Sequence, residues 1–200
     1  MGIVYRAIRL SDGELVAIKM ILKGDFANDT DRQRFEAEAD AASRLNHPNI
    51  IPIYETGEHQ GRSFFCMKLI TGQSLSERLS RGPLPPQRAA KIMNEISDAI
   101  SFAHQNGILH RDLKPSNVMV GAFGEVVVMD WGLAKIGNDP TEFGDSVSIH
   151  TGAAPIMTDR SRKSAYVTLS GSIAGTPNYM PPEQARGDHP RVGPWSDVYA

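Results

Sequence analysis

Cysteine is almost absent from this sequence of 200 residues, which contains only Cys66. A single cysteine excludes an internal disulfide framework and fits a reducing compartment, so we expect a cytoplasmic chain, although a full-length parent could be membrane-anchored. Long apolar runs are also missing: residues 126–129 form one of the longest, whereas a helix that spans a bilayer needs about 20 apolar residues. We therefore expect no membrane segment.

Neither sign of charge dominates, because 21 basic residues face 23 acidic ones for a formal net charge of -2. The sequence has no basic stripe of the kind that nucleic-acid binding requires, so we expect no nucleic-acid partner. The hydrophobic share of 40% and the charged share of 22% are those of an ordinary globular protein. The length suffices for one domain, or for one domain of two lobes.

The first third of the chain alternates between apolar and polar residues as strands do, around one helical stretch. The pattern predicts a helix over 31–45, which Asp31 can cap and which His47-Pro48-Asn49 ends, because proline disfavours helical dihedrals in the residue before it. The expected strands of this small sheet are Ile3–Ile8, Leu15–Ile21, Ile50–Tyr54 and Phe64–Leu69.

After Gly72 the pattern becomes mainly helical. Ser74 and Glu77 have capping-box spacing for a short helix, and Pro85-Pro86 opens a longer one that ends at Gly107. Residues 137–175 are rich in Gly, Ser, Thr, Asp and Pro without a lasting period, which predicts a long loop. The predicted buried stripe of the longer helix consists of Ile92, Met93, Ile96, Ala99, Ile100 and Ala103.

The most specific motif is the run His110-Arg111-Asp112-Leu113-Lys114-Pro115-Ser116-Asn117, followed by Asp130-Trp131-Gly132. Val16-Ala17-Ile18-Lys19 and Glu38 precede it, and Gly175-Thr176-Pro177-Asn178-Tyr179 and Pro181-Pro182-Glu183 follow it. These motifs, in this order, resemble those of the protein kinase family, and their wording is most similar to bacterial serine/threonine kinases. Trp131 stands where the family usually has phenylalanine.

The resemblance covers essentially the whole chain and implies an α+β, bilobal protein-kinase fold. It assigns residues 1–66 to a partial N-terminal lobe with an antiparallel sheet and one helix, 67–72 to a hinge, and 73–200 to a partial, mainly helical C-terminal lobe. Only Gly2 and Val4 match the family's glycine-rich loop, and 195–200 looks like the start of the large central helix. We therefore expect a fragment cut at both ends, impaired as an enzyme when it stands alone.

The resemblance implies an ATP-dependent kinase that phosphorylates serine and threonine hydroxyls. Asp112 would accept or orient the hydroxyl proton, and Lys114 would steady the transferring phosphate. Lys19 would reach the ATP phosphates and pair with Glu38, for which Glu36 is the rival. Taken alone, Asp112 also fits a loop or capping aspartate, and Lys19 fits a surface lysine on an edge strand.

ATP and Mg²⁺ are the expected cofactors. Asn117 and Asp130 offer the hard oxygen ligands that Mg²⁺ prefers, while leaving room for waters and phosphates. Strand alternation places Ala17 and Lys19 on one face, where a small residue can cover an adenine. The ATP-binding residues that the resemblance implies are Gly2, Val4, Ala17, Lys19, Met67, Lys68, Ile70 and Met119.

Protein substrates with serine or threonine are the expected partners, and the chain itself is a further expected substrate. An arginine such as Arg111 can pair with a phosphate and order a loop. The expected autophosphorylation sites are Thr168, Ser170 and Ser172, although a Ser/Thr-rich loop that is merely solvated is the simpler alternative.

Three further residues receive roles from the resemblance alone. Thr176 belongs to a shelf for the protein substrate. Glu183 is expected to pair with an arginine of a later helix, and Asp197 is expected to bond to the backbone of the 110–117 run.

Two other functions compete with this interpretation. A small-molecule phosphotransferase of kinase-like fold would lack the segment 175–183, which therefore favours protein substrates. A pseudokinase would keep the fold as a binding module without phosphate transfer. The five residues Lys19, Glu38, Asp112, Asn117 and Asp130 are all intact, so only the truncation supports a pseudokinase.

Overall fold

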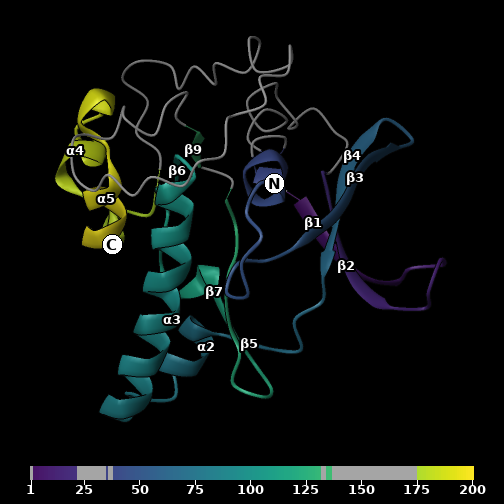
Figure 1. The fold of residues 1–200 in the computed structure, drawn as a ribbon, viewed down its shortest axis with the longest axis horizontal. Helices are drawn as coiled ribbons and strands as arrows, with labels where there is room; N and C mark the ends of the chain where they lie inside the picture. Colours follow the sequence, from purple (N-terminus) through teal and green to yellow (C-terminus); the bar gives the residue numbers. More distant parts are fainter. Residues whose placement is uncertain (1, 22–34, 36–37, 132–133, 137–174) are drawn as a thin grey trace, which may run out of the picture.

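The computed structural model describes residues 2–21, 35, 38–131, 134–136 and 175–200 (Figure 1). The four-stranded sheet lies on one side of the molecule and the long helix α3 on the other (Figure 1). The strands are β1 (Gly2–Ile8), β2 (Leu15–Ile21), β3 (Ile53–His59) and β4 (Arg62–Lys68), in the antiparallel order β1-β2-β4-β3. The predicted strand over Leu15–Ile21 is confirmed at both ends.

The predicted strand Ile50–Tyr54 is wrong in its bounds, because β3 begins only at Ile53. Ile50 and Ile51 are buried, and the backbone N–H of Ile51 donates to Val128 O at 3.0 Å. These two residues therefore join the core of the helical part before the chain enters the sheet. Pro52 has no N–H to give a sheet ladder, which favours a strand that starts after it.

The predicted first helix is present in the described residues, since Phe35 and residues 38–43 are helical. The expected cap, Asp31, lies outside the described residues. Phe35 packs against Phe65 of β4, with ring centroids 4.9 Å apart. This contact holds the helix against the sheet, and Glu38 stands one turn further along.

Two helices have the terminal residues that the sequence predicts for them. The short helix α2 (Leu75–Leu79) has the predicted capping box, in which Ser74 Oγ accepts from Glu77 N at 3.1 Å and Glu77 Oε2 accepts from Ser74 N at 2.8 Å. The helix α3 (Pro86–Gln105) has a proline in its first turn, and Gly107 follows it with φ of 72°. That left-handed dihedral suits glycine and stops the helix.

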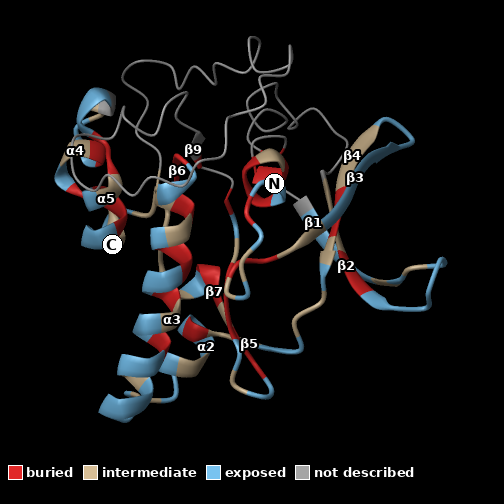
Figure 2. Cartoon of the chain, in the orientation of Figure 1, coloured by how far each residue is buried: buried red, intermediate tan, exposed pale blue. Residues whose placement is uncertain are grey.

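The buried stripe of α3 is confirmed with one exception, Met93, which is 55% exposed. Each helical residue turns the side chain by about 100°, so position 93 lies beyond the edge of the stripe that Ile92 and Ile96 define. Figure 2 shows the buried side of α3 turned toward the interior. The main core there comprises Ile96, Ala99, Ile100, Ala103, Ile108, Val118, Val126, Val128 and Trp131, among others.

Short strands and turns complete the described chain. A three-stranded sheet has the order β5-β7-β8, from β5 (Gly72–Ser74), β7 (Val118–Gly121) and β8 (Val126–Val128), and β6 (Ile108–Leu109) pairs with β9 (Lys135–Ile136). The 3-10 turns are η1 (Pro115–Asn117), η4 (Pro177–Tyr179) and η5 (His189–Arg191), and the last helices are α4 (Pro182–Ala185) and α5 (Pro194–Tyr199). The four-stranded antiparallel sheet and the long helix α3 occupy separate regions of the molecule, so the predicted α+β class is confirmed.

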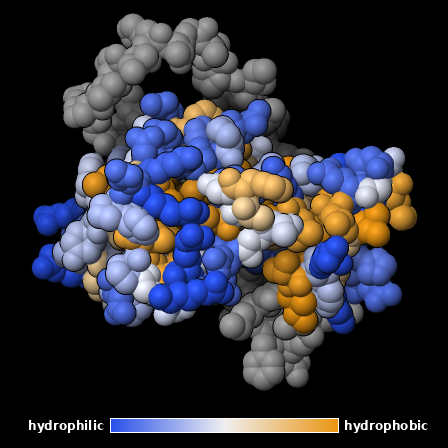
Figure 3. Space-filling view, turned by 90° about the horizontal axis from the view of Figure 1, so that it is seen from below, coloured by the Kyte–Doolittle hydropathy of each residue, from blue (hydrophilic) through white to orange (hydrophobic). Residues whose placement is uncertain are grey.

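The four-stranded sheet carries apolar side chains on its surface. Figure 3 shows apolar residues gathered on the side of the molecule where this sheet lies. The exposed ones include Ile3, Val4, Tyr5, Ile8, Leu10, Leu15 and Tyr54. None of the helices within the described residues has the length and apolar character that a membrane span requires.

Candidate active site

Lys19 and Glu38 form a close ion pair between β2 and the first helix. Lys19 Nζ lies 2.6 Å from Glu38 Oε1 and 2.7 Å from Oε2. Glu38 is only 7% exposed, so this carboxylate has little access to water. The pairing favours Glu38 over its sequence neighbour Glu36, which lies outside the described residues.

Asp130 brings a second carboxylate to the same lysine, with Oδ1 at 3.3 Å from Lys19 Nζ. Burial is the largest cause of a raised pKa for Glu38, which reaches about 7; the charge of Lys19 opposes this rise and the charge of Asp130 adds to it. Burial also works to lower the pKa of Lys19, but the charges of Glu38 and Asp130 outweigh it and raise that pKa. The lysine therefore stays charged between two carboxylates.

A second cluster joins Asp112, Lys114 and Thr176. Lys114 Nζ lies 2.6 Å from Asp112 Oδ2 and donates to Thr176 Oγ1 at 2.5 Å. Thr176 Oγ1 in turn donates to Asp112 Oδ1 at 2.8 Å. The three side chains thus form a ring of hydrogen bonds, in which a hydroxyl donates to a carboxylate oxygen and a cationic amine lies next to both. This arrangement can receive a hydroxyl proton and stabilise negative charge next to it.

Asn117 and Asp130 are the residues that could hold a divalent cation. Asn117 Nδ2 donates to Asp112 O at 2.8 Å, which assigns the amide nitrogen. The amide oxygen accepts only a long contact of 3.5 Å from Ser116 Oγ, so it can still serve as a ligand. Asp130 has a half-exposed side chain, so water can reach its carboxylate. Across the described residues, no three or more His, Cys, Asp and Glu gather as a metal cluster. One amide and one carboxylate fit Mg²⁺, which keeps several waters and shares phosphate oxygens.

Asp197 of α5 anchors the 110–117 loop through hydrogen bonds to its backbone. Asp197 accepts the backbone N–H of His110 at 2.9 Å and of Arg111 at 2.7 Å, and His104 Nε2 lies 2.8 Å from it. Burial works to raise the pKa of Asp197, but the hydrogen bond from His104, the charge of His110 and the two backbone donors outweigh it and lower that pKa. Arg111 has φ of 63°, an uncommon dihedral that these bonds help to maintain.

Four of the expected ATP-binding residues share one face of the four-stranded sheet. Directly paired residues of neighbouring strands point to the same side. Val4 pairs with Lys19, Ala17 pairs with Met67, and Ala17 and Lys19 are two residues apart on β2. Ala17 is 4% exposed and Val4 is 55% exposed. The register therefore places Val4, Ala17 and Met67 on the same face as Lys19.

The remaining expected ATP-binding residues lie outside this group of four. Gly2 pairs with Ile21 at the start of β1, and Met119 of β7 pairs with Ser74 of β5. Lys68 is exposed at the end of β4, and Ile70 packs against the main core.

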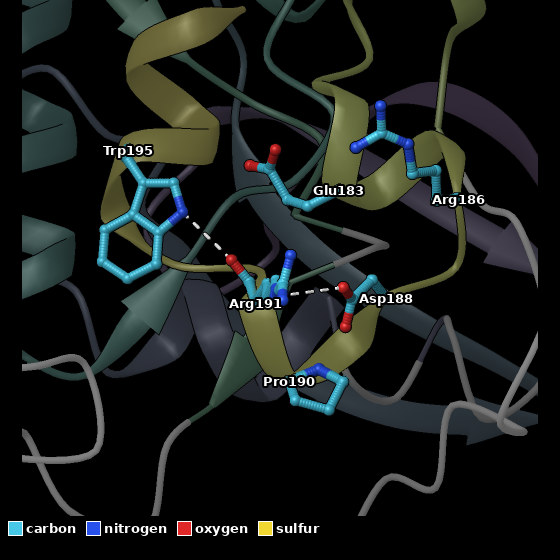
Figure 4. Close-up of a pocket in the computed structure, with 6 residues that line it drawn as sticks. All are labelled: Glu183, Arg186, Asp188, Pro190, Arg191 and Trp195. Atoms are coloured by element: carbon cyan, nitrogen blue, oxygen red, sulfur yellow. Dashed lines mark hydrogen bonds and ion pairs between the residues drawn. The ribbon is translucent and has the colours of Figure 1, made fainter.

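Glu183 lines a cavity of about 390 Å³ (Figure 4). Its Oε1 accepts a hydrogen bond of 2.5 Å from Ser196 Oγ. The cavity is lined by Glu183, Arg186, Asp188, Pro190, Arg191 and Trp195. Trp195 Nε1 donates to Arg191 O at 3.0 Å, which holds the turn η5 beside α5. None of the lining residues belongs to the Lys19 or Asp112 clusters.

Sequence reasoning missed two residues that support the loop. Gln184 is 5% exposed, and its Nε2 donates to Arg111 O at 2.7 Å, so α4 is tied to the loop that carries Asp112. His104 binds Asp197. The signal for His104 was its place four residues after Ile100, beside the apolar stripe of α3, where a polar side chain must find a partner. The expected phosphorylation sites Thr168, Ser170 and Ser172 lie outside the described residues.

Comparison with known proteins agrees with the geometry of the two clusters. The family described as "Protein kinase domain" matches residues 1–200. The serine/threonine-protein kinase PknB of Mycobacterium leprae is 38% identical over 92% of this chain, and pkn3 of Myxococcus xanthus is 38% identical over the whole chain. PrkC of Bacillus subtilis is 37% identical, also over the whole chain. The matched regions cover 26%, 34% and 27% of these relatives, so the chain spans about a quarter to a third of their length.

Proposed function

Because the chain belongs to the protein kinase domain family, we propose that it transfers the γ-phosphate of ATP to serine and threonine hydroxyls of proteins. The observation that carries this proposal is the ring of Asp112, Lys114 and Thr176. It supplies a carboxylate for a hydroxyl proton, a cation for a transferring phosphate and a contact from the segment expected to receive a protein substrate.

Each side chain of the site has a step that suits its surroundings. Asp112 takes the proton of the attacking hydroxyl, and its position is fixed by Lys114 and by the backbone contact with Asn117. The ammonium group of Lys114 then stabilises the negative charge of the phosphoryl group during its transfer. In the other cluster, Lys19 holds the phosphates of ATP and Glu38 keeps the lysine oriented.

Mg²⁺, when bound with ATP, neutralises phosphate charge. Asp130 and Asn117 are the residues proposed to hold it, through one carboxylate and one amide oxygen. The adenine is proposed to lie on the face of the sheet that carries Ala17 and Met67, with residues 67–72 acting as the hinge between lobes of 1–66 and 73–200.

Protein substrates are favoured over small molecules because Thr176 bonds directly to Asp112. A hydroxyl acceptor that arrives along the segment 175–183 is thereby placed at the catalytic carboxylate. The names of the relatives, all serine/threonine-protein kinases, support the same substrate class. The chain itself is a further proposed substrate, with Thr168, Ser170 and Ser172 as the sites and Arg111 as the phosphate partner.

The test is transfer of labelled γ-phosphate from ATP to three acceptors: a generic protein rich in serine and threonine, the chain itself, and an aminoglycoside as a small-molecule alcohol. We expect label in the first two, on phosphoserine and phosphothreonine, and its loss when Mg²⁺ is chelated. Label confined to the aminoglycoside would replace the proposal with a small-molecule phosphotransferase. Nucleotide binding without any transfer would leave a pseudokinase.

A further inference from the structure

The peptide groups on either side of Arg111 are held by two buried side chains from the last part of the chain. Asp197 accepts the N–H of Arg111 at 2.7 Å, and Gln184 Nε2 donates to its carbonyl oxygen at 2.7 Å. The exposed fractions of Gln184 and Asp197 are 5% and 3%, so water competes little for these bonds. Because Arg111 directly precedes Asp112, the two bonds fix the backbone from which the Asp112 side chain extends.

Arg111 depends on such support because its backbone has an uncommon conformation. Its φ of 63° lies in the left-handed region, which a residue with a Cβ keeps only where surrounding contacts hold it. The bond from Asp197 acts on the peptide group that precedes Arg111. The peptide group between Arg111 and Asp112 is held by the bond from Gln184, while its N–H makes a longer bond of 3.3 Å to His110 Nδ1. Gln184 therefore acts on the peptide group that sets the direction of Asp112.

Gly175 leaves the space through which Gln184 reaches Arg111. A Cβ at position 175 would lie 2.6 Å from Gln184 Nε2 and 3.5 Å from Arg111 O. The first distance is shorter than an ordinary contact, and the φ of 133° at Gly175 also favours glycine. The next residue, Thr176, donates to Asp112 Oδ1. This part of the chain thus contacts both the backbone before Asp112 and the carboxylate itself.

From these contacts we propose that Gln184 is a positioning residue for phosphate transfer, which holds the peptide group before Asp112 and thereby places the Asp112 carboxylate at the substrate hydroxyl. The role rests on the function proposed above for Asp112. The motifs described for the sequence end at Glu183, one residue before Gln184. A carbonyl oxygen can only accept a hydrogen bond, so the group that matters is the amide N–H of Gln184.

The test is steady-state transfer of labelled γ-phosphate from ATP to a serine- and threonine-rich protein by the full chain. Gln184→Met keeps the length of the side chain and removes its donor, and Gln184→Asn keeps the amide on a side chain one methylene shorter. We expect about tenfold lower kcat for both variants, the effect of losing one buried hydrogen bond, with KM for ATP unchanged. Gln87→Met, at an exposed glutamine of α3, is the matched control and should keep the wild-type rate.

A double-mutant cycle separates the positioning of Asp112 from a general effect on the fold. In the Asp112→Asn background, Gln184→Met should lower transfer by no more than about twofold, since the carboxylate that Gln184 positions is already gone. A further loss of about tenfold in that background, or a wild-type kcat in both Gln184 variants, would overturn the role. Circular dichroism checks the fold of each variant, and if Gln184→Met is unfolded, Gln184→Asn takes its place in the cycle.

Hydrogen exchange keeps this role distinct from the proposed transfer activity. Exchange of the backbone N–H groups of 110–117, measured by mass spectrometry on the full chain, should be faster in Gln184→Met than in wild type and unchanged in Gln87→Met. A wild-type chain that transfers no phosphate would refute the proposed function, and the exchange rates would still decide whether Gln184 holds the loop. Equal exchange in wild type and Gln184→Met would refute that hold, whatever the activity.

Discussion

Thr176 and Asp112 are 64 residues apart in the chain, yet Thr176 Oγ1 donates a hydrogen bond of 2.8 Å to Asp112 Oδ1. Lys114 Nζ lies within 2.6 Å of both partners, so the threonine hydroxyl is fixed from two sides. The carboxylate that is proposed to take the substrate proton is thereby coupled to the segment that is proposed to receive the substrate.

Replacement of Thr176 by valine should slow transfer to a protein substrate by about tenfold, because one hydrogen bond to a charged group is lost while the side-chain shape is kept. The effect should fall on kcat, with little change in KM for ATP, since Lys19 is not touched. Thr176→Ser keeps the hydroxyl and should retain most of the activity. An equal loss in both variants would mean that the hydroxyl is not what matters.

The raised pKa of Glu38 makes stability depend on pH. Its carboxyl has a pKa of about 7 in the folded chain against 4.5 as the ordinary value, so the folded state holds an extra proton between these values. The contribution of this group to the free energy of unfolding is fully present below pH 4.5 and is lost as the pH rises to about 7.

Urea unfolding from pH 5 to pH 8 measures this slope in wild type and in Glu38→Gln, which cannot titrate. We expect the variant to lose the part of the slope between pH 5 and pH 7. Glu58→Gln, at an exposed carboxylate on β3, is the control and should keep it. Identical slopes in wild type and Glu38→Gln would show that Glu38 does not titrate in this range.

Asp197 should contribute to the free energy of unfolding in addition to holding the 110–117 loop in place. Asparagine at this position would turn an N–H donor toward one of the backbone N–H groups of His110 and Arg111. We expect Asp197→Asn to lower the free energy of unfolding by about 2 kcal/mol, in line with the loss of a buried hydrogen bond to a charged group. Denaturant unfolding beside Asp98→Asn, an exposed position on α3, measures the difference. A cost as small as that of Asp98→Asn would remove Asp197 from this role.

Replacing either of the two proposed metal ligands, Asp130 and Asn117, should change the Mg²⁺ dependence of transfer, whereas replacing an unrelated carboxylate should not. Asp130→Asn removes the charge of one ligand. The Mg²⁺ concentration that gives half-maximal transfer should therefore rise by about tenfold or more. Asn117→Ala should act in the same direction, and it also removes the hydrogen bond to Asp112 O. Asp98→Asn should leave the Mg²⁺ dependence unchanged. A wild-type Mg²⁺ dependence in Asp130→Asn would exclude that residue as a ligand.

Much of the local structure could be predicted because it depends on short-range chemistry. The capping box of Ser74 and Glu77, the proline start of α3 and its stop at Gly107 each involve neighbours in sequence. Strand Leu15–Ile21 was predicted at both ends because alternation and flanking turn residues agree there.

The errors arose where distant parts of the chain decide the outcome. Ile50 and Ile51 read as a strand, but their backbone groups pair near Val128, far along the chain, and β3 starts later. Met93 is apolar, yet the limited width of the core leaves it exposed on α3. Likewise, the hydrogen bond from Gln184 to Arg111 O depends on how α4 docks, which no local pattern records.

The central claim is that Asp112 serves phosphate transfer in a folded, nucleotide-binding chain. Its most direct test is single-turnover transfer of labelled γ-phosphate to a serine- and threonine-rich protein by wild type, Asp112→Asn and the control Asp98→Asn. The account predicts a loss of about 100-fold or more for Asp112→Asn, with ATP affinity unchanged, and wild-type rates for Asp98→Asn. Transfer by Asp112→Asn within threefold of wild type would contradict it.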